Sequence, residues 1–376
     1  MIDVERLTAE FMELVRTDSE TKHERAMSEV MKRKFAELGL PVEEDDAQAK
    51  SGHEAGNLFA RLDASFGKEE VPAIFFTCHM DTVVPGRGIK PRLDEDGYIR
   101  SDGTTILGAD DKAGIAALLE AIRQVQERKI PHGTVQFVIT VGEESGLAGA
   151  RALDASKLHA EFGYALDSNG KVGDIVVAAP AQSRIDVKVY GKAAHAGVNP
   201  EDGISAIQVA SRAISQMPLG RIDGETTANI GRFAGGQQTN IVCDYVEILA
   251  EARSLSEDKL KKQVAAMRQA FEEAAAQYGT RVDFQDHRMY PQFRFDGEAP
   301  VVKLASRAIE RIGRVPRTIQ SGGGSDANIF NGLGFPTVNL AVGYENIHTT
   351  AEQMPVSELA KAAELVIAII EEAARS

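Results

Sequence analysis

Apolar residues recur at helical spacing in two stretches near the start of the chain. They are Leu7, Phe11, Leu14 and Val15 in the first stretch and Ala26, Val30, Phe35 and Leu38 in the second. Gly39 and Pro41 then predict the end of the second helix. Apolar runs at residues 71–76 and 134–141 indicate buried strands, and a helix is predicted between them at residues 112–126. This alternation predicts an α/β layer with a mostly parallel sheet flanked by helices.

The pattern changes after Pro180. Residues 183–190 alternate polar and apolar side chains, as a strand with one face in solvent does. Helical stretches at residues 203–217 and 256–278 follow, with a strand-like segment at residues 244–251 between them. This part of the chain therefore reads as an α+β insert.

The α/β pattern resumes near Pro300 and ends with a strand-like segment at residues 336–342 and a helix at residues 356–374. We therefore predict one discontinuous α/β domain, made of residues 1–180 and 293–376, and a second domain inserted at residues 181–292. A chain of 376 residues is long enough for two such domains.

Charge and composition narrow the choice of partners. Asp and Glu outnumber Lys and Arg by 56 to 42, a net charge of −14, so neither nucleic acid nor an anionic membrane is an expected partner. The first residues lack the basic and apolar regions of a signal peptide, and the aliphatic run at residues 365–370 is too short to span a bilayer. We expect a cytoplasmic protein. Its two cysteines, Cys78 and Cys243, are too few for a disulfide framework or a thiolate zinc site.

Acidic and histidine residues follow several strand-like runs. His79 and Asp81 come just after the first run, and residues two apart in extended chain point to the same side. A histidine held by a carboxylate is a common metal-ligand arrangement. Taken alone, the pair is more often a polar strand end whose histidine is satisfied.

Two further motifs carry adjacent acids. Asp110 and Asp111 lie in a glycine-flanked turn that enters a helix, where capping alone would explain an acid. Glu143 and Glu144 follow the second strand-like run, and adjacent acids repel each other unless a cation or solvent separates their charges. A solvated loop is the alternative for this pair.

Asp167 and His348 are uninformative singly, but the set of motifs indicates a common site. Open α/β sheets bind ligands beyond the carboxyl ends of their strands, so we expect these groups to converge. Carboxylates mixed with imidazole, without thiolate, favour zinc, cobalt or manganese over a structural zinc site. The carboxylates are numerous enough for two metals that share one bridging acid.

The order of these motifs resembles that of the M20 family of dinuclear metallopeptidases. The sequence of residues 107–114 is most similar to the peptidase T (tripeptide aminopeptidase) branch of that family. The resemblance covers nearly the whole chain. It implies that Asp110 bridges two divalent ions, most simply zinc, with cobalt or manganese as alternatives. It also implies a non-proline cis peptide bond after Asp110. The remaining implied roles are one metal held by His79 and Asp167, the other by Glu144 and His348, Asp81 orienting His79, and Glu143 as general base.

The resemblance also implies substrate contacts, most of them in the insert. His195, in the segment 191–197, would reach toward an active site, often that of a partner subunit. Asn240 and Arg253 would contact a substrate carboxylate, for which arginine offers two parallel donors. Gly323 lies in the run 321–326, which resembles a nest of backbone amides able to hold an anion. Without the resemblance, an exposed histidine, a strand-end arginine and a flexible turn explain these features.

We therefore expect a metallo-exopeptidase that acts on short peptides, as a tripeptidase-like aminopeptidase. An N-acyl amino acid amidohydrolase, or a dipeptidase or carboxypeptidase with the same metal centre, is the main alternative. A non-catalytic binding protein on an inherited peptidase fold is a further one, and a purely structural scaffold would leave the adjacent acids unexplained. The insert is expected to serve as a lid or to form a homodimer through an exposed strand edge.

Overall fold

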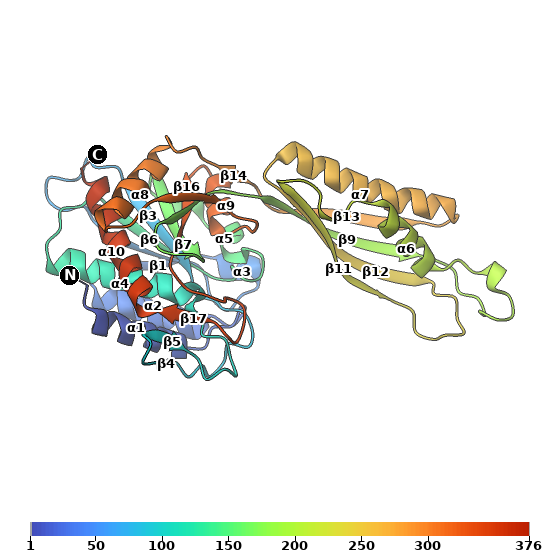
Figure 1. Ribbon diagram of the computed structural model, residues 1–376, viewed down its shortest axis with the longest axis horizontal. Helices are drawn as coiled ribbons and strands as arrows, with labels where there is room; N and C mark the ends of the chain where they lie inside the picture. Colours follow the sequence, from blue (N-terminus) through green and yellow to red (C-terminus); the bar gives the residue numbers. More distant parts are fainter. Residues whose placement is uncertain (1, 376) are drawn as a thin grey trace. The chain divides into compact units, whose positions relative to one another are not determined.

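The computed structural model describes residues 2–375, which form two compact units (Figure 1). Unit 1 contains the chain up to Ala178, then Phe295–Ser321, and then the chain from Ser325 onward. Unit 2 contains Ala179–Arg294 together with Gly322–Gly324. The lid or dimerisation role expected for the inserted segment stays a prediction.

The main sheet of unit 1 has the strand order β1-β2-β6-β3-β7-β16-β8, with β15 paired to β8. The pairs β6–β3, β3–β7 and β7–β16 at its centre are parallel, and the pairs toward the first edge are antiparallel. The strands are β1 (Val42–Glu44), β2 (Leu58–Leu62), β3 (Ile74–His79), β6 (Val135–Thr140), β7 (Phe162–Ser168), β8 (Asp174–Ala179), β15 (Arg317–Gln320) and β16 (Thr337–Ala341).

Both faces of this sheet are covered, which explains why its central strands read as continuous apolar runs. Phe76 belongs to the large core, which also receives side chains from α1, α2, α4, α8 and α10. Its neighbour Phe75 points to the opposite face and packs against Phe330 of α9, with ring centroids 4.9 Å apart. The helices are α1 (Val4–Arg16), α2 (Arg25–Glu37), α3 (Ala47–Ser51), α4 (Ala109–Glu127), α5 (Ala148–Ala152), α8 (Pro300–Arg311), α9 (Asp326–Gly332) and α10 (Val356–Ala373), with the 3-10 turn η1 (Ala155–Lys157).

A small antiparallel sheet of short strands, β17-β5-β4, also belongs to unit 1. It joins β4 (Arg92–Leu93), β5 (Tyr98–Arg100) and β17 (Gln353–Pro355). The pairing brings the segment after His348 next to the segment before α4.

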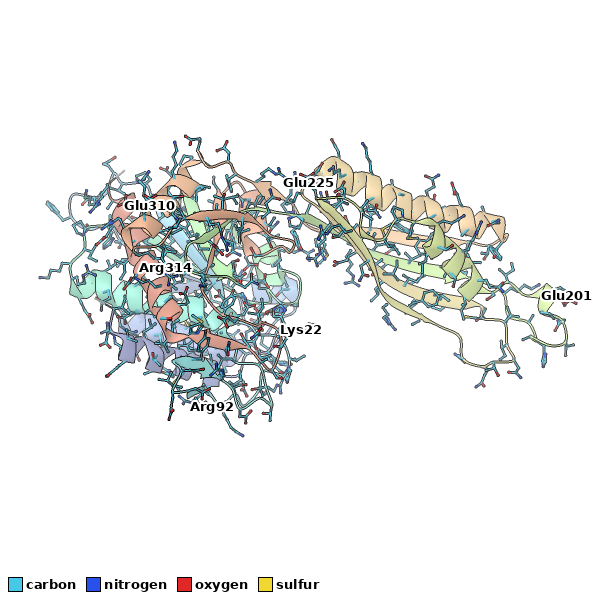
Figure 2. All side chains as sticks on the ribbon, viewed as in Figure 1. Lys22, Arg92, Glu201, Glu225, Glu310 and Arg314 are labelled. Carbon is cyan, nitrogen blue, oxygen red and sulfur yellow. The ribbon has the colours of Figure 1, made fainter. Side chains whose placement is uncertain are left out.

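Unit 2 is an antiparallel sheet of order β10-β11-β12-β9-β13 with two helices. Burial alternates strictly along β9, whose inward side chains share one core with α6 and α7. The elements are β9 (Ala181–Tyr190), α6 (Ala206–Gln216), β10 (Gly220–Arg221), β11 (Thr226–Gly235), β12 (Tyr245–Ser254), α7 (Glu257–Gln277), β13 (Val282–Tyr290) and the short β14 (Phe293–Arg294). Glu201, labelled in Figure 2, marks the 3-10 turn η2 (Pro200–Asp202) between β9 and α6.

The predicted fold class is confirmed, and the element boundaries need small corrections. The first central strand begins at Ile74 rather than at residue 71, since Pro72 has no N–H for the ladder. The helix predicted from residue 203 begins at Ala206, where the Ser205 side chain accepts the N–H of Gln208. Within residues 2–375, none of the helices combines the length and the apolar character needed to cross a membrane.

Candidate active site

His79 is the last residue of β3, and it lies buried among carboxylates. Its Nε2 is 3.0 Å from Asp110 Oδ1 and 3.6 Å from Asp167 Oδ1. Its Nδ1 is 3.0 Å from the carbonyl oxygen of Asp81 and 3.4 Å from that residue's Oδ1. Asp81 thus faces one side of the imidazole, which leaves Nε2 for the two other acids.

Asp110 lies between two histidines. Its Oδ1 faces His79, and its Oδ2 is 3.3 Å from Nε2 of His348. The same Nε2 of His348 is 2.9 Å from Glu144 Oε1. The Asp110–Asp111 peptide bond is cis, as the sequence resemblance implied. One carboxylate thus presents one oxygen to each imidazole, as expected of a bridging acid.

The Glu143–Glu144 loop follows β6 and is fixed by Asp81. The backbone N–H groups of Glu143 and Glu144 donate to the two oxygens of the Asp81 carboxylate, at 3.0 and 3.2 Å. Asp81 is fully buried, so these bonds are not shared with solvent. Asp81 therefore contacts the acidic loop as well as His79, and the sequence alone did not indicate the contact with the loop.

The charges in this cluster are poorly balanced without a cation. Burial raises the pKa of Asp167 to about 7, and burial together with the nearby Asp167 raises the pKa of Glu143. Hydrogen bonds to Asp110 and Glu144 raise the pKa of His348 to about 10. Asp167, Glu143 and His348 thus hold their protons more readily, which is how closely packed ligands respond when no metal ion neutralises them.

The donor set fits divalent metal ions. Two groups place their ligand atoms within 4.8 Å of one another: His79, Asp110 and Glu144, and His79, Asp111 and Asp167. Imidazole nitrogen combined with carboxylate oxygen suits zinc, cobalt or manganese. Asp111 is an addition to the predicted set. Its Oδ2 accepts the backbone N–H of His79 at 3.2 Å, whereas its buried Oδ1 has no hydrogen-bond partner among the described residues.

Three side chains that support the site, two acids and one amide, were not predicted from the sequence. Asp326 is buried and accepts a hydrogen bond from Thr140 Oγ1 at 2.5 Å, and burial raises its pKa to about 6. Asn339 holds Asp167 through bonds of 2.9 and 2.7 Å to its backbone N–H and carbonyl. Glu352 accepts backbone N–H groups just before and at Asp110. Asp326 ends the glycine-rich run 321–326; nothing in the sequence distinguishes the other two.

The predicted substrate residues lie in unit 2. His195 is exposed, and its Nδ1 accepts the N–H groups of Gly197 and Val198 at 3.1 and 3.2 Å. The loop that carries Asn240 pairs with the His195 loop, because the N–H of Ala196 donates to the carbonyl of Asn240 at 2.9 Å. The substrate roles of His195 and Asn240 stay predictions.

Arg253 and Gly323 complete that set. The Arg253 guanidinium makes a two-point ion pair with Glu251, at 2.9 and 3.0 Å, and Gln182 donates to the same carboxylate. Gly323 belongs with its two neighbouring glycines to unit 2. The structure thus gives Arg253 an acidic partner within the chain, and its contact with a substrate carboxylate stays a prediction.

A site of this kind, with histidine and carboxylate groups at the carboxyl ends of parallel strands, is typical of metal-dependent hydrolases. The model of the peptidase family M20/M25/M40 matches residues 75–372, and the chain belongs to this family. The predicted family is thereby confirmed, and with it the expectation of a metal-dependent peptidase.

Similar proteins cover the chain almost completely. An uncharacterised Bacillus subtilis protein, YqjE, is 60% identical over 375 residues and 100% of both chains. The crystal structure of aminopeptidase PepT from Bacillus cereus is 61% identical with a TM-score of 0.93, and covers 99% of both chains. The structure of a Staphylococcus aureus tripeptidase is 49% identical with a TM-score of 0.96, and covers 100% of both chains.

Proposed function

We propose that the protein is an aminopeptidase that removes the N-terminal residue from short peptides, tripeptides above all. The observation that carries the proposal is the Asp110 carboxylate, whose two oxygens face His79 and His348 at 3.0 and 3.3 Å. The choice of substrate is supported by the aminopeptidase and tripeptidase structures that match the chain over nearly its full length.

We assign two divalent ions to the cluster. His79 and Asp167 would hold one ion, Glu144 and His348 the other, and Asp110 both. When bound, such ions lower the pKa of a water molecule and polarise the scissile carbonyl. Zinc is the proposed metal, with cobalt or manganese as alternatives, because the donors combine imidazole with hard oxygen.

Glu143 is the proposed general base. It accepts one proton from the attacking water, whose oxygen adds to the carbonyl carbon of the peptide bond. The C–N bond then breaks, and the same proton passes from Glu143 to the leaving nitrogen. A carboxyl group whose pKa is raised by burial and by Asp167 holds a transferred proton more readily than an exposed carboxylate does, which suits it to both steps.

We propose that His195, Asn240, Arg253 and Gly323 contribute to substrate binding. The pairing of the His195 and Asn240 loops supports a shared role for these two residues. In this proposal Arg253 would turn from Glu251 to the substrate carboxylate, for which its planar fork is suited.

The decisive experiment compares a tripeptide with the same tripeptide N-acetylated, with added zinc or cobalt and with a chelator control. Cleavage of the free-amine peptide alone, abolished by the chelator, is the expected result. Cleavage of the acetylated peptide would instead favour an acylase, dipeptidase or carboxypeptidase with the same metal site. Metal binding without hydrolysis of either peptide would favour a binding protein.

We also propose that unit 2 forms a homodimer through β11. Among the described residues, the part of β11 after Ala228 pairs with β12 and with no other strand, so its second edge is open. Phe233 lies on this part and is 40% exposed. Such a strand edge can pair with its copy. Sedimentation of the full chain would give twice the monomer mass, and a monomer at micromolar concentration would contradict the proposal. A cytoplasmic location stays a prediction from the sequence.

A further inference from the structure

Glu352 is a buried carboxylate, 2% exposed, that lies against the loop leading to Asp110. Its Oε2 accepts the backbone N–H groups of Leu107 and Gly108 at 2.8 and 2.7 Å. Its Oε1 accepts the backbone N–H of Asp110 at 3.0 Å. Three donors from one loop thus converge on a side chain more than 240 residues away in sequence.

This loop needs an outside acceptor because of its backbone conformation. Gly108, the N-cap of α4, is left-handed, with φ +75°, and has no side chain to cap the helix. Asp110 and Asp111 also depart from helical geometry, with ψ of 102° and 28°. The first N–H groups of a helix have no partner within it, and burial without one is costly. Glu352 therefore replaces the missing cap.

The same carboxylate belongs to the segment that carries His348. Glu352 lies four residues after that histidine, and its own N–H donates to the carbonyl of Thr349 at 3.1 Å, closing a turn. At the other end of the segment, His348 has a positive φ of 62° and places Nε2 3.3 Å from Asp110 Oδ2. The segment therefore touches the Asp110 loop twice, once through His348 and once through Glu352.

We propose that Glu352 is a positioning residue that fixes the Asp110 loop relative to the His348 segment and thereby sets the affinity of the metal site. The inference rests on the proposed function, because it takes Asp110 and His348 as metal ligands. Glu352 itself needs no contact with metal or substrate in this role. Groups that hold metal ligands in place typically change metal affinity by about 10- to 100-fold when they are mutated.

The substitution Glu352→Gln tests the proposal with little change in volume. A glutamine can keep its oxygen toward Leu107 and Gly108, but its amide NH₂ would then face the N–H of Asp110, where two donors oppose each other. The bond to Asp110 is the one most affected. Glu120→Gln is the matched control. Glu120 is also buried and accepts the Nε–H of Arg6 at 2.8 Å, and it lies on α4 away from the site.

The measurement is calorimetric titration of the metal-free full-length variants with Zn²⁺ alone, after circular dichroism has shown that each is folded. We expect Glu352→Gln to bind zinc about 10- to 100-fold more weakly than the natural chain. Glu120→Gln should lose thermal stability yet keep its zinc affinity. A folded Glu352→Gln chain with undiminished zinc affinity would overturn the proposal, as would an equal loss of affinity in Glu120→Gln.

Hydrogen–deuterium exchange of the natural chain covers the case in which Glu352→Gln does not fold. The amides of Leu107, Gly108 and Asp110 should be protected even without metal, and rapid exchange there would contradict the inference. If the natural chain itself fails to bind two zinc ions, the proposed function fails first. That outcome is distinguishable, because it appears before any variant is compared.

Discussion

At the scale of single residues, the adjacent acids Glu143 and Glu144 differ in the contacts of their carboxylates. The Glu144 carboxylate is 2.9 Å from His348, which itself faces Asp110. Glu143 is next to it in the chain, but its bond to Asp81 is made by the backbone, so its carboxylate is not used in that contact. The contact with His348 supports the proposed role of Glu144 as a ligand, and the carboxylate of Glu143 is left for its proposed role as base.

Replacing these residues should separate catalysis from metal binding. We expect Glu143→Ala to keep both metal ions but to lose about 10²- to 10⁴-fold in kcat, since it removes the proposed general base. His348→Ala should retain only one ion, because its imidazole is a proposed ligand of the second. Metal analysis of the two purified variants, alongside the natural chain, checks this, and two ions in both variants would contradict the assignment.

The buried acids also predict how stability depends on pH. Burial raises the pKa of Glu24, Asp167 and Glu352 to about 7, above their values in an unfolded chain. Between about pH 4 and 7 the folded state therefore binds more protons than the unfolded state, so stability falls as pH rises. The raised pKa of His348, about 10, acts in the same direction above about pH 6.5.

We therefore expect the metal-free protein to melt at a higher temperature at pH 5 than at pH 7.5. Zinc should reverse the order, because the ligands must lose their protons to bind it. Calorimetric scans at both pH values, with and without zinc, make the comparison. A metal-free chain that is more stable at pH 7.5 would show that these acids do not dominate.

Much of the site could be predicted from residue order, and the reason for the rest is physical. His79, Asp81, Glu143 and Glu144 follow apolar runs, so the topology of a parallel sheet brings them together. Glu352 and Asn339 act through backbone groups of residues distant in sequence, and no local pattern reveals such a bond. Asp326 lies in a motif whose three glycines are a stronger sequence signal than its acid.

At the scale of elements, the loop after β6 is constrained by glycine. Gly142 has φ +60°, and a Cβ added there would lie 2.3 Å from Nε2 of the buried His53. His53 Nε2 also contacts the hydroxyl of Ser145 at 2.9 Å, on the far side of Glu143 and Glu144. The imidazole thus packs under both ends of the acidic loop, and only glycine fits above it.

Gly142→Ala should consequently weaken the active site as well as the fold. The left-handed conformation alone costs a non-glycine residue about 1–2 kcal/mol, and the clash with His53 adds to this. Gly39→Ala is the control, because Gly39 has φ +73° but nothing within 4 Å of an added Cβ. Urea unfolding and kcat of both variants would test this. Equal losses of stability and of activity in the two would contradict a specific role for His53.

Long elements could be predicted better than short ones. The helix predicted at residues 256–278 and α7 (Glu257–Gln277) nearly coincide, since a long amphipathic period is a strong signal. The sheet of β4, β5 and β17 was not predicted, because strands of two or three residues have no readable period. This sheet nevertheless contains β17, which begins directly after Glu352.

At the scale of the whole molecule, each unit has its own hydrophobic core. The core of unit 2 lies between α6, α7 and one face of its sheet. The first and last long strands of this unit, β9 and β13, are neighbours, and Gln182 pairs with Tyr290. The two ends of the inserted segment therefore leave the unit side by side, which is how inserted domains are accommodated without disturbing their host.

We accordingly expect residues 179–294, expressed alone, to fold cooperatively, with a free energy of unfolding of about 5–15 kcal/mol. Phe271→Ala, which empties a fully buried position of this core, should lower that value by about 3–5 kcal/mol. Urea titration followed by circular dichroism measures both. A gradual, non-cooperative loss of signal would mean that the segment needs the rest of the chain.

The strand order of unit 1 has a consequence for biosynthesis. Strand β16 lies between β7 and β8, although more than 150 residues separate it from both in the chain. The ribosome releases the polypeptide from its N-terminus. Residues 179–294 are therefore complete before β15 and β16, which belong to the main sheet of unit 1, have been made. The active-site cluster is completed later still, because His348 follows β16 in the chain. The growing chain therefore lacks a finished peptidase centre during most of its own translation, when unfolded nascent polypeptides are nearest to it.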